Sequence, residues 1–426
     1  MTTKQKNIFI LTLVTLTIFG TLLIAPVTFA EDADYVGSET CSMCHPVQYE
    51  AWEPSQHTGK LLTPEESQAR GGHDPPEGYT WDDILYVIGS KWKSRYVNLE
   101  GYIITDAGGE PGNNQWNYAT EEWVDYHAGE VKPYSCGQCH TTGYSPEGNQ
   151  DGIEGLVGTW EERNIGCESC HGAGGDHVTG PAANPMQVDL GAELCGTCHS
   201  RPKGIPEYEY NNPDSFSYVA GEGAHKHHQQ YTDWNSSGHS EELEPFLRDS
   251  CLKCKSTDNI YNTDLVDKAA KTITVSEAYN GITCASCHEP HGLNLWITRE
   301  DDESYPSIYE PGSDADKNSV CIQCHVGGGT PEKKTKAEWH HTQGEMHMES
   351  IHYASGATCA DCHMPLDSKS AVPYDIRNHS LSVMSYGTYD YTCGQAIGCH
   401  QDQGSDWAAE MIEYIQTDVE AGIELA

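Results

Sequence analysis

Bulky apolar side chains are scarce in this sequence of 426 residues. Only 37% of the residues are hydrophobic, and only 5 are Phe. A chain of this length with so few apolar residues is poorly supplied for a large conventional core. Something other than its own side chains must therefore fill part of the interior.

Positive charge is scarce as well. Lys and Arg number 24 against 64 Asp and Glu, which gives a formal net charge of −40. Nucleic acids and anionic lipid surfaces are bound mainly through Lys and Arg, so neither is an expected partner. The acidic surface either keeps the protein soluble or selects cationic and mineral partners.

Long hydrophobic runs are missing after the first 30 residues. Residues 1–30 carry Lys4 and Lys6, continue with an apolar run from Ile8 to Val27, and end in Thr28-Phe29-Ala30. This layout predicts a secretory signal peptide, and hence an exported protein that is extracellular, on the cell surface or periplasmic. The apolar run of about 20 residues could also span a bilayer, so an uncleaved N-terminal membrane anchor is the alternative.

Cysteine and histidine are abundant instead, with 18 Cys and 22 His. Seven times, two Cys are separated by two residues and followed directly by His. An even cysteine count in an exported protein usually indicates disulfides, but this spacing is that of covalent haem attachment, in which the thiols bind the haem and the His binds its iron. One such motif could belong to a zinc site, whereas seven are specific for c-type haem. The motifs are Cys41/Cys44/His45, Cys136/Cys139/His140, Cys167/Cys170/His171, Cys195/Cys198/His199, Cys284/Cys287/His288, Cys321/Cys324/His325 and Cys359/Cys362/His363.

Two further cysteine pairs deviate from this pattern. Cys251 and Cys254 have the same spacing but are followed by Lys255, and Cys393 and Cys399 are separated by five residues and followed by His400. Counting both, nine pairs use all 18 Cys and predict nine haem c groups per chain, or eight if Cys393 and Cys399 form a disulfide or remain thiols. The expected proximal axial ligands are His45, His140, His171, His199, Lys255, His288, His325, His363 and His400.

The 14 His outside these motifs can supply the second axial ligand of each iron. An iron with two His ligands has no open position for a substrate, which suits electron transfer. Six of these His lie in local patterns typical of distal ligands: His57, His177, His239, His291, His352 and His379. Further candidates are His127, His225, His228, His340, His341 and His347.

The expected fold is mainly α-helix and irregular coil, organised around a stacked haem array, with few strands. The 42 Gly and 21 Pro, with turn clusters at Asp106–Asn114 and Tyr208–Ser217, favour irregular connections. A small hairpin is expected over Val87–Ile104, around a turn at Glu100-Gly101. Residues Asp406–Ile423 carry apolar residues at helical spacing, which would pack against the last haem or bind a partner.

The motifs after residue 230 resemble those of the pentahaem cytochrome c nitrite reductases. Cys251–Asn259 (CLKCKSTDN) resembles the Lys-ligated active-site haem of that family, and His352 and His379 match positions that carry distal His ligands there. Three further motifs follow in the order of the family, at Cys284, Cys321 and Cys359. The resemblance implies that residues 231–426 form a pentahaem region.

The first part of the chain resembles the N-terminal haem cluster of octahaem and nonahaem relatives. The resemblance rests on Val36–His45 (VGSETCSMCH) and Cys167–His177 (CESCHGAGGDH), and it implies a tetrahaem region over residues 31–230. Joined together, the two regions are similar to the nonahaem extracellular terminal metal reductases. That similarity implies electron transfer to extracellular acceptors, with other cytochromes as partners and self-assembly into an oligomer or filament as a further expectation.

Residues that handle substrate in the nitrite reductases are largely replaced here. The Glu-Tyr-Tyr run of the family, which also helps bind calcium, corresponds to Val326-Gly327-Gly328-Gly329, and the position of its active-site Arg corresponds to Ser237. Without a cation and a phenol to hold and protonate an anionic substrate, neither a calcium site nor efficient nitrite reduction is expected. Lys255 and His341, which matches the distal-pocket His of the family, are the candidate catalytic residues. Three functions remain open: an electron conduit or terminal reductase, a nitrite or hydroxylamine reductase at Lys255, and a filament subunit.

Overall fold

The structure of the chain is a computed structural model. It describes residues 34–200, 229–241, 249–258, 274, 280–297, 307–308, 318–322, 324–325, 343–364, 377–381, 400, 402–404, 406–411, 413–414 and 417. Several expectations from the sequence lie outside the described residues: the leader at 1–30, the turn cluster Tyr208–Ser217, the run 326–329, His225, His228, His340, His341, Cys393 and Cys399. Across the described residues, no helix is both long and apolar enough to cross a membrane.

The helices are short, and several of them contain or end at a cysteine motif. They are α1 (Ser38–Ser42), α2 (Pro46–Trp52), α3 (Pro64–Ala69), α4 (Gly137–His140), α5 (Glu168–His171), α6 (Gly175–Thr179), α7 (Ala192–His199), α8 (Gln230–Asn235), α9 (Leu252–Lys255), α11 (Ser319–Ile322), α12 (Gln343–Met348), α13 (Ile351–Ala354) and α14 (Cys359–His363). Single 3₁₀ turns include η1 (Gln56–Gly59), η4 (Gly238–Ser240) and η7 (Cys284–Ser286). Isolated helices shorter than about 12 residues are marginal in water, so these turns depend on what packs against them.

A seven-stranded antiparallel sheet occupies the segment between the first two motifs. Its strands are β1 (Leu61–Leu62), β2 (Ile84–Ile88), β3 (Lys93–Asn98), β4 (Tyr102–Ile103), β7 (Gln115–Asn117), β8 (Glu122–Val124) and β9 (Lys132–Pro133). The strand order is β1-β2-β3-β4-β9, and β7 pairs with both β3 and β8. Four two-stranded pairs accompany the sheet: β5 (Asp106–Ala107) with β6 (Glu110–Pro111), β10 (Thr141–Thr142) with β13 (Glu162–Arg163), β11 (Ser145–Asn149) with β12 (Val157–Thr159), and β14 (Trp296–Ile297) with β15 (Ser307–Ile308).

The hairpin expected over Val87–Ile104 is present, but it is part of this larger sheet. In β3 and β4, Val97 lies opposite Ile103, and the turn between them closes through the Gly101 N–H, which donates to the Asn98 carbonyl at 2.9 Å. Gly101 has a φ of +84°, and a Cβ there would lie 2.6 Å from the Leu156 nitrogen. Only glycine satisfies both conditions without strain. The turn cluster Asp106–Asn114, expected to be irregular, contains the β5–β6 pair.

Side chains of the sheet region build a conventional core. One buried cluster contains Leu61, Ile88, Val97, Ile103, Tyr126, Tyr134, Leu156 and Trp160, and a second contains Leu62, Ile84, Val87, Tyr96 and Ile104. Adjacent residues such as Leu61 and Leu62 or Tyr96 and Val97 contribute to different clusters, because successive strand residues point to opposite faces. The sheet is thus covered on both faces.

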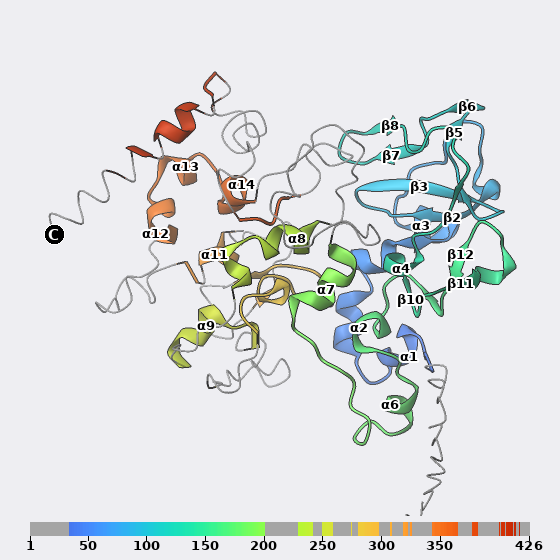
Figure 1. Cartoon of the computed structure of the whole chain (residues 1–426), viewed down its shortest axis with the longest axis horizontal. Coiled ribbons are helices and arrows are strands. Elements are labelled where there is room, and N and C mark those ends of the chain that lie inside the picture. Colours follow the sequence, from blue (N-terminus) through green and yellow to red (C-terminus); the bar gives the residue numbers. More distant parts are fainter. Residues whose placement is uncertain are drawn as a thin grey trace, which may run out of the picture.

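The two ends of the described chain lie at opposite ends of the molecule (Figure 1). The sheet lies at one end and α12, α13 and α14 at the other, with α7 and α8 between them. Near the C-terminus, residues 406–411 are helical, and the ring of Trp407 lies 4.7 Å from that of His400. Met411 on the same helix is 40% exposed. Trp407, the first apolar residue at helical spacing in Asp406–Ile423, therefore packs beside a motif His. Met411, the next one, faces solvent.

Candidate haem-binding sites

Helical turns position several of the motifs that the structure describes. The backbone N–H of the motif His donates to the carbonyl of the first Cys at 2.9 Å in His45, 3.1 Å in His171, 2.9 Å in His288 and 3.0 Å in His325. This bond closes a helical turn, so the two Cys and the His project from one side of it. None of the 16 cysteines that the structure describes forms a disulfide. The motifs thus keep two thiols and an imidazole together in the arrangement that haem attachment requires.

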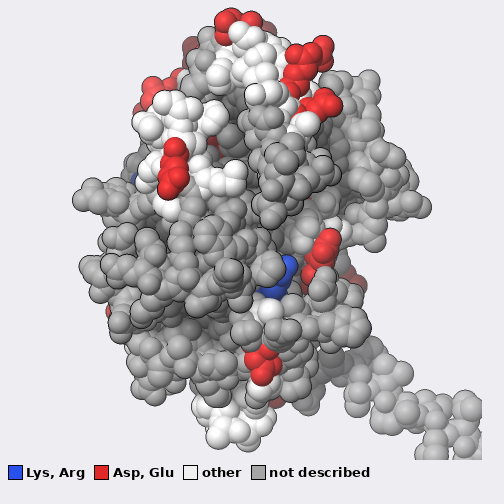
Figure 2. Space-filling model, turned by 90° about the vertical axis from the view of Figure 1, so that its left-hand side faces the viewer, with Lys and Arg blue, Asp and Glu red and all other residues white. Residues whose placement is uncertain are grey.

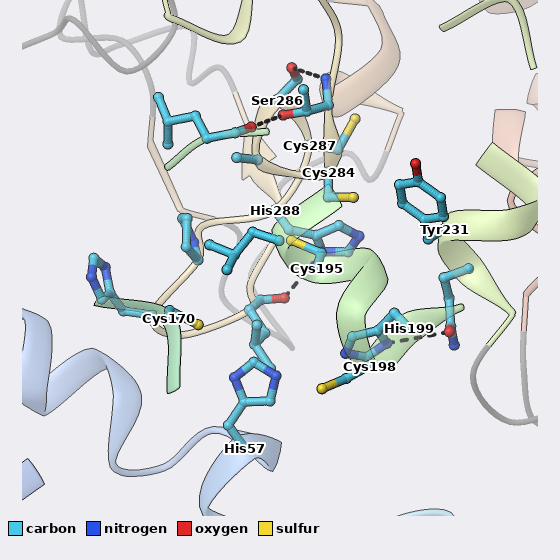
Figure 3. A pocket seen from close by; sticks show the side chains of 18 of the residues that line it. His57, Cys170, Cys195, Cys198, His199, Tyr231, Cys284, Ser286, Cys287 and His288 are labelled. Carbon is cyan, nitrogen blue, oxygen red and sulfur yellow. Dashed lines mark hydrogen bonds between the residues drawn. The ribbon is translucent and has the colours of Figure 1, made fainter. Parts of the chain in front are cut away.

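A continuous cavity of about 2970 Å³ lies between these turns. Cys side chains from eight of the nine cysteine pairs line it, as do all six His that the sequence predicts as distal ligands. Figure 3 shows the thiols of Cys195, Cys198, Cys284 and Cys287 in one part of this space, with the ring of His57 reaching in from a different segment. A space of this size lined by thiols and imidazoles fits haem. Bound haem would fill this part of the interior in place of bulky apolar side chains.

Imidazole rings face one another in six pairs, five of which lie across this cavity. In every pair, one ring belongs to a motif and the other to one of the six His expected as distal ligands. The centroid separations are 6.2 Å for His45–His177, 6.2 Å for His57–His199, 6.4 Å for His171–His291, 5.9 Å for His239–His325, 6.4 Å for His288–His379 and 6.5 Å for His352–His400.

These separations match two imidazoles on opposite sides of one metal ion. A bond from a metal to an imidazole nitrogen is about 2 Å long, so the two bound nitrogens lie about 4 Å apart and the ring centres about 6 Å apart. The rings of the pairs are too far apart for direct stacking. The space between them would accommodate one metal ion.

The remaining candidates occupy different surroundings. His140 is 8% exposed, and Lys255 is exposed where it lines the cavity. His363 and His347 also line the cavity, and the Nε2 atom of His347 lies 3.1 Å from the Ala357 carbonyl oxygen. His127, in contrast, is not among the residues that line the cavity, and its Nδ1 lies 2.8 Å from the Glu130 carboxylate.

Burial keeps several of the facing imidazoles neutral. It lowers the pKa of His57 to about 3 and the pKa values of His199 and His379 to about 4, with neighbouring positive groups adding smaller effects. Only the neutral ring has a lone pair for iron. At neutral pH these side chains are therefore in the form that can bind a metal.

Second hydrogen bonds fix the orientation of many of these rings. A backbone carbonyl oxygen lies near Nδ1 of His171 (Gln187, 2.6 Å), His177 (Asn184, 2.8 Å), His379 (Arg377, 2.9 Å), His288 (Leu293, 3.3 Å) and His363 (Leu381, 3.3 Å). The amide oxygen of Gln230 takes this place for His199 at 3.3 Å, and the Glu289 carboxylate does so for His291 at 2.7 Å. A partner on Nδ1 leaves Nε2 to face the iron and raises the basicity of the ring.

The sequence did not identify these partners, because backbone carbonyls leave no sequence signal. Glu289 is the exception. It stands between the motif His288 and the distal candidate His291 in the run Cys287-His288-Glu289-Pro290-His291, so its place beside the ring could have been proposed.

Neighbouring motifs touch through their thiols. The thiol of Cys41 lies beside that of Cys167, and the thiol of Cys195 beside that of Cys284. The first contact is supported by Glu168, whose carboxylate accepts the N–H groups of Val36, Gly37 and Gly174 at 2.7 to 3.2 Å. Because Glu168 lies next to Cys167 and its carboxylate holds the backbone just before Cys41, it keeps the first and third motifs side by side.

A buried hydroxyl network connects the Lys255 motif to its neighbour in the sequence. Thr257 and Thr283 are buried, and their hydroxyl oxygens lie 3.0 Å apart. Thr257 also donates to the Gly281 carbonyl at 2.7 Å, and Thr283 to the Leu190 carbonyl at 2.7 Å. The motifs at Cys251, Cys284 and Cys195 are therefore tied together by residues within five positions of them.

Comparison with known families gives two partial matches. Residues 330–424 match the family of cytochrome c552, and residues 40–75 and 113–172 match the family of cytochrome c554 and c-prime. Among curated proteins, the dissimilatory sulfite reductase MccA of Wolinella succinogenes is 23% identical over 78% of this chain and 50% of its own length. The C-type polyheme cytochrome OmcC of Geobacter sulfurreducens is 23% identical over 54% of this chain and 36% of its own length. The chain thus spans half the length, or less, of these curated relatives.

Solved structures show the same fold. The outer cell wall cytochrome OcwA superposes with a TM-score of 0.66 at 24% identity, over 91% of this chain and 88% of that one. The undecaheme cytochrome from the S-layer of Carboxydothermus ferrireducens superposes with a TM-score of 0.51 at 22% identity, over 83% of this chain and 52% of that one. Together with its attachment motifs, these matches make the chain similar to the multihaem c-type cytochromes.

Proposed function

We propose that the chain binds nine haem c groups and conducts electrons through them. The observation that carries this proposal is the set of six facing imidazole pairs, each joining a motif His to a His from a distant segment. A bound haem supplies an iron that alternates between its ferric and ferrous states and so carries one electron. Two His ligands leave such an iron no position for a substrate, as a conduit requires.

The contacts between motifs support a continuous path. Cys41 touches Cys167, and Cys195 touches Cys284. Between these two contacts, burial raises the pKa of the Cys170 thiol to about 11, and Cys195 lies close enough to add to this rise. The order of neighbouring sites is therefore the Cys41/Cys44, Cys167/Cys170, Cys195/Cys198 and Cys284/Cys287 sites.

Sites of the two sequence regions interlock. The ring of His171, in the tetrahaem region 31–230, faces His291 in the pentahaem region 231–426, and Cys195 touches Cys284 across the same division. We infer that the two regions share ligands and fold as one array.

The charge of the chain bears on its partners. In the face seen in Figure 2, the described charged residues are mainly Asp and Glu, in line with the formal charge of −40. Such a surface favours cationic or mineral acceptors and basic patches of other cytochromes. With the expected signal peptide, this supports a role outside the cytoplasm, as a conduit or terminal reductase for external acceptors.

The intact mass of the mature protein and its electron paramagnetic resonance spectrum test this proposal. We expect a mass that corresponds to nine haems and a ferric spectrum dominated by low-spin iron. Single Ala substitutions of His57, His177, His239, His291, His352 and His379 should each convert one low-spin iron to high-spin. A series that leaves the spin count unchanged would refute the ligand assignment, and a mass for eight haems would place a disulfide or thiols at Cys393 and Cys399.

A second candidate function is reduction of a small oxyanion or hydroxylamine at the Lys255 site. The observation in its favour is that an amine replaces the usual imidazole in a motif whose Lys lines the cavity. An amine must lose its proton to bind iron. For electron conduction alone, the replacement of imidazole by an amine has no evident benefit. The name of the relative MccA adds sulfite to nitrite and hydroxylamine as substrates to try.

Steady-state assays with reduced viologen test this second candidate. Ser237 and the run 326–329 stand where the nitrite reductases have their active-site Arg and Tyr. We therefore expect slow turnover of nitrite and hydroxylamine. Lys255→His should abolish that turnover and leave reduction of the other irons unchanged. Fast turnover of any of the three substrates, lost in Lys255→His, would make the protein an enzyme first.

A further inference from the structure

His291 differs in the charge of its hydrogen-bond partner from six other cavity imidazoles whose partner at Nδ1 the structure describes. Five rings have a neutral backbone carbonyl at Nδ1 and His199 has the amide of Gln230, at distances of 2.6 to 3.3 Å. At Nδ1 of His291, a carboxylate oxygen of Glu289 lies at 2.7 Å instead. The partner of this ring therefore carries a full negative charge.

The carboxylate of Glu289 is held in place from several sides. Its side chain is only 6% exposed, and its second oxygen accepts the N–H of Gly292. The backbone around it is tied as well, since the Glu289 N–H donates to Asn294 at 2.8 Å and the Leu293 N–H donates to Glu289 at 2.7 Å. A tight loop thus fixes the charge against the ring, and water has little access to replace it.

We propose that Glu289 lowers the reduction potential of the iron at the Cys167/Cys170 site below that of the neighbouring sites. This rests on the proposed ligation of that iron by His171 and His291, whose rings face each other at 6.4 Å. A carboxylate that accepts the Nδ1 proton makes the imidazole a stronger donor, and a stronger donor favours the ferric state, which has the higher charge. The buried negative charge acts in the same direction because little water screens it. The step affected is the uptake of one electron by this iron from its reductant, with no bond made or broken.

The position of this site gives the low potential a consequence for electron flow. Cys167 touches Cys41 on one side, and Cys170 lies near Cys195 and Cys198 on the other. An iron with a lower potential than its neighbours therefore stands between the Cys41/Cys44 site and the Cys195/Cys198 site. An electron that passes between these neighbouring sites must first reduce this low-potential iron, which is energetically unfavourable. Glu289 determines how unfavourable that reduction is.

Other carboxylates near this site lack the same contact. Glu168 and Glu162 lie close enough to Cys41 to raise its thiol pKa to about 12, together with burial and Cys167, which have the larger effects. Their hydrogen bonds go to backbone N–H groups and to the Ser38 hydroxyl. Glu162 therefore serves as a control for the loss of a negative charge without the loss of a hydrogen bond to a ring.

Glu289→Gln tests the proposal in the full, haem-loaded protein. Gln keeps the size of the side chain and an oxygen that can accept the Nδ1 proton, and it removes the charge, so His291 gains the kind of partner that His199 has. In a spectroelectrochemical titration we expect about a tenfold rise in the ratio of ferrous to ferric iron at one site at a fixed applied potential, which is 59 mV for one electron. The low-spin resonance of the same iron should change its g-values. Glu289→Asp should recover part of the shift, and Glu162→Gln should produce a smaller one.

Two outcomes would overturn the inference, and a third measurement separates it from the proposed function. Unchanged potentials and g-values in Glu289→Gln, or an equal shift in Glu162→Gln, would show that the ring contact does not set the potential. His291→Ala must convert one low-spin iron to high-spin. If it does not, the proposed ligation fails; if it does while Glu289→Gln shifts nothing, only the role of Glu289 fails.

Discussion

The sheet region and the cavity region of this chain are built on different physical bases. Between Leu61 and Trp160, side chains fill two buried clusters on the faces of one sheet, and residues such as Val97 and Leu156 are 0% exposed. Around the cavity, single helical turns present Cys and His to a space of about 2970 Å³. The first region has a core of its own, whereas the second is completed by a bound group.

The largest expected effect follows from removing one attachment motif. Cys284→Ser/Cys287→Ser should lower the haem content by one and loosen the adjoining Cys195/Cys198 site, because Cys284 touches Cys195. Limited proteolysis should then cut the cavity region faster and leave the sheet region protected. Loss of one haem with an unchanged proteolysis pattern would contradict the idea that bound groups hold this region together.

A core substitution in the sheet should destabilise the sheet region and leave the haem content unchanged. Leu156 is 0% exposed in the first buried cluster, and Leu→Ala at such sites costs about 2–5 kcal/mol. Leu156→Ala should therefore lower the free energy of unfolding of the sheet region, followed by chemical denaturation with Trp fluorescence. Its haem content and ferric resonance spectrum should remain those of the wild type. Val131 is 85% exposed, so Val131→Ala is the matched control and should change stability by no more than about 0.5 kcal/mol.

The two regions also differ in how far the sequence predicts them. Chemistry fixes the spacing of a cysteine motif, so the sequence predicts the attachment positions, and local patterns such as Ser237-Gly238-His239 predict the six distal candidates. The partner of each ring could not, because facing residues such as His171 and His291 are 120 positions apart. The backbone carbonyls that lie at Nδ1 of several rings could not be predicted from the sequence either.

In the sheet region, the turn at Gly101 was predictable from the residues around it, and the full sheet was not. Strands such as β4, with two residues, and β8, with three, are too short to show a periodic pattern. Their pairing depends on tertiary contacts, for example that of β7 with both β3 and β8. A short strand of this kind is defined by its neighbours in space.

The smallest expected effect concerns an ion pair that joins the sheet region to the segment leading into the third motif. The guanidinium of Arg163 binds both carboxylate oxygens of Glu66, at 2.6 and 2.9 Å, and the side chains are 28% and 42% exposed. Exposed pairs of this kind contribute about 0.2–1 kcal/mol, so Glu66→Gln should reduce the free energy of unfolding only within that range.

The hydrogen bond from Arg163 is the main cause that lowers the pKa of Glu66 below its ordinary value of 4.5, partly opposed by burial. A carboxyl with a lowered pKa stabilises the fold above the pKa of the unfolded chain, and this stabilisation is lost as the pH falls through the lower, folded value. Wild type and Glu66→Gln should therefore differ most at neutral pH and converge in acid, as measured by thermal unfolding of the sheet region from pH 7 downward. A difference that stays constant down to acid pH would show that the carboxylate contributes through its hydrogen-bonding shape and that its charge has no part in it.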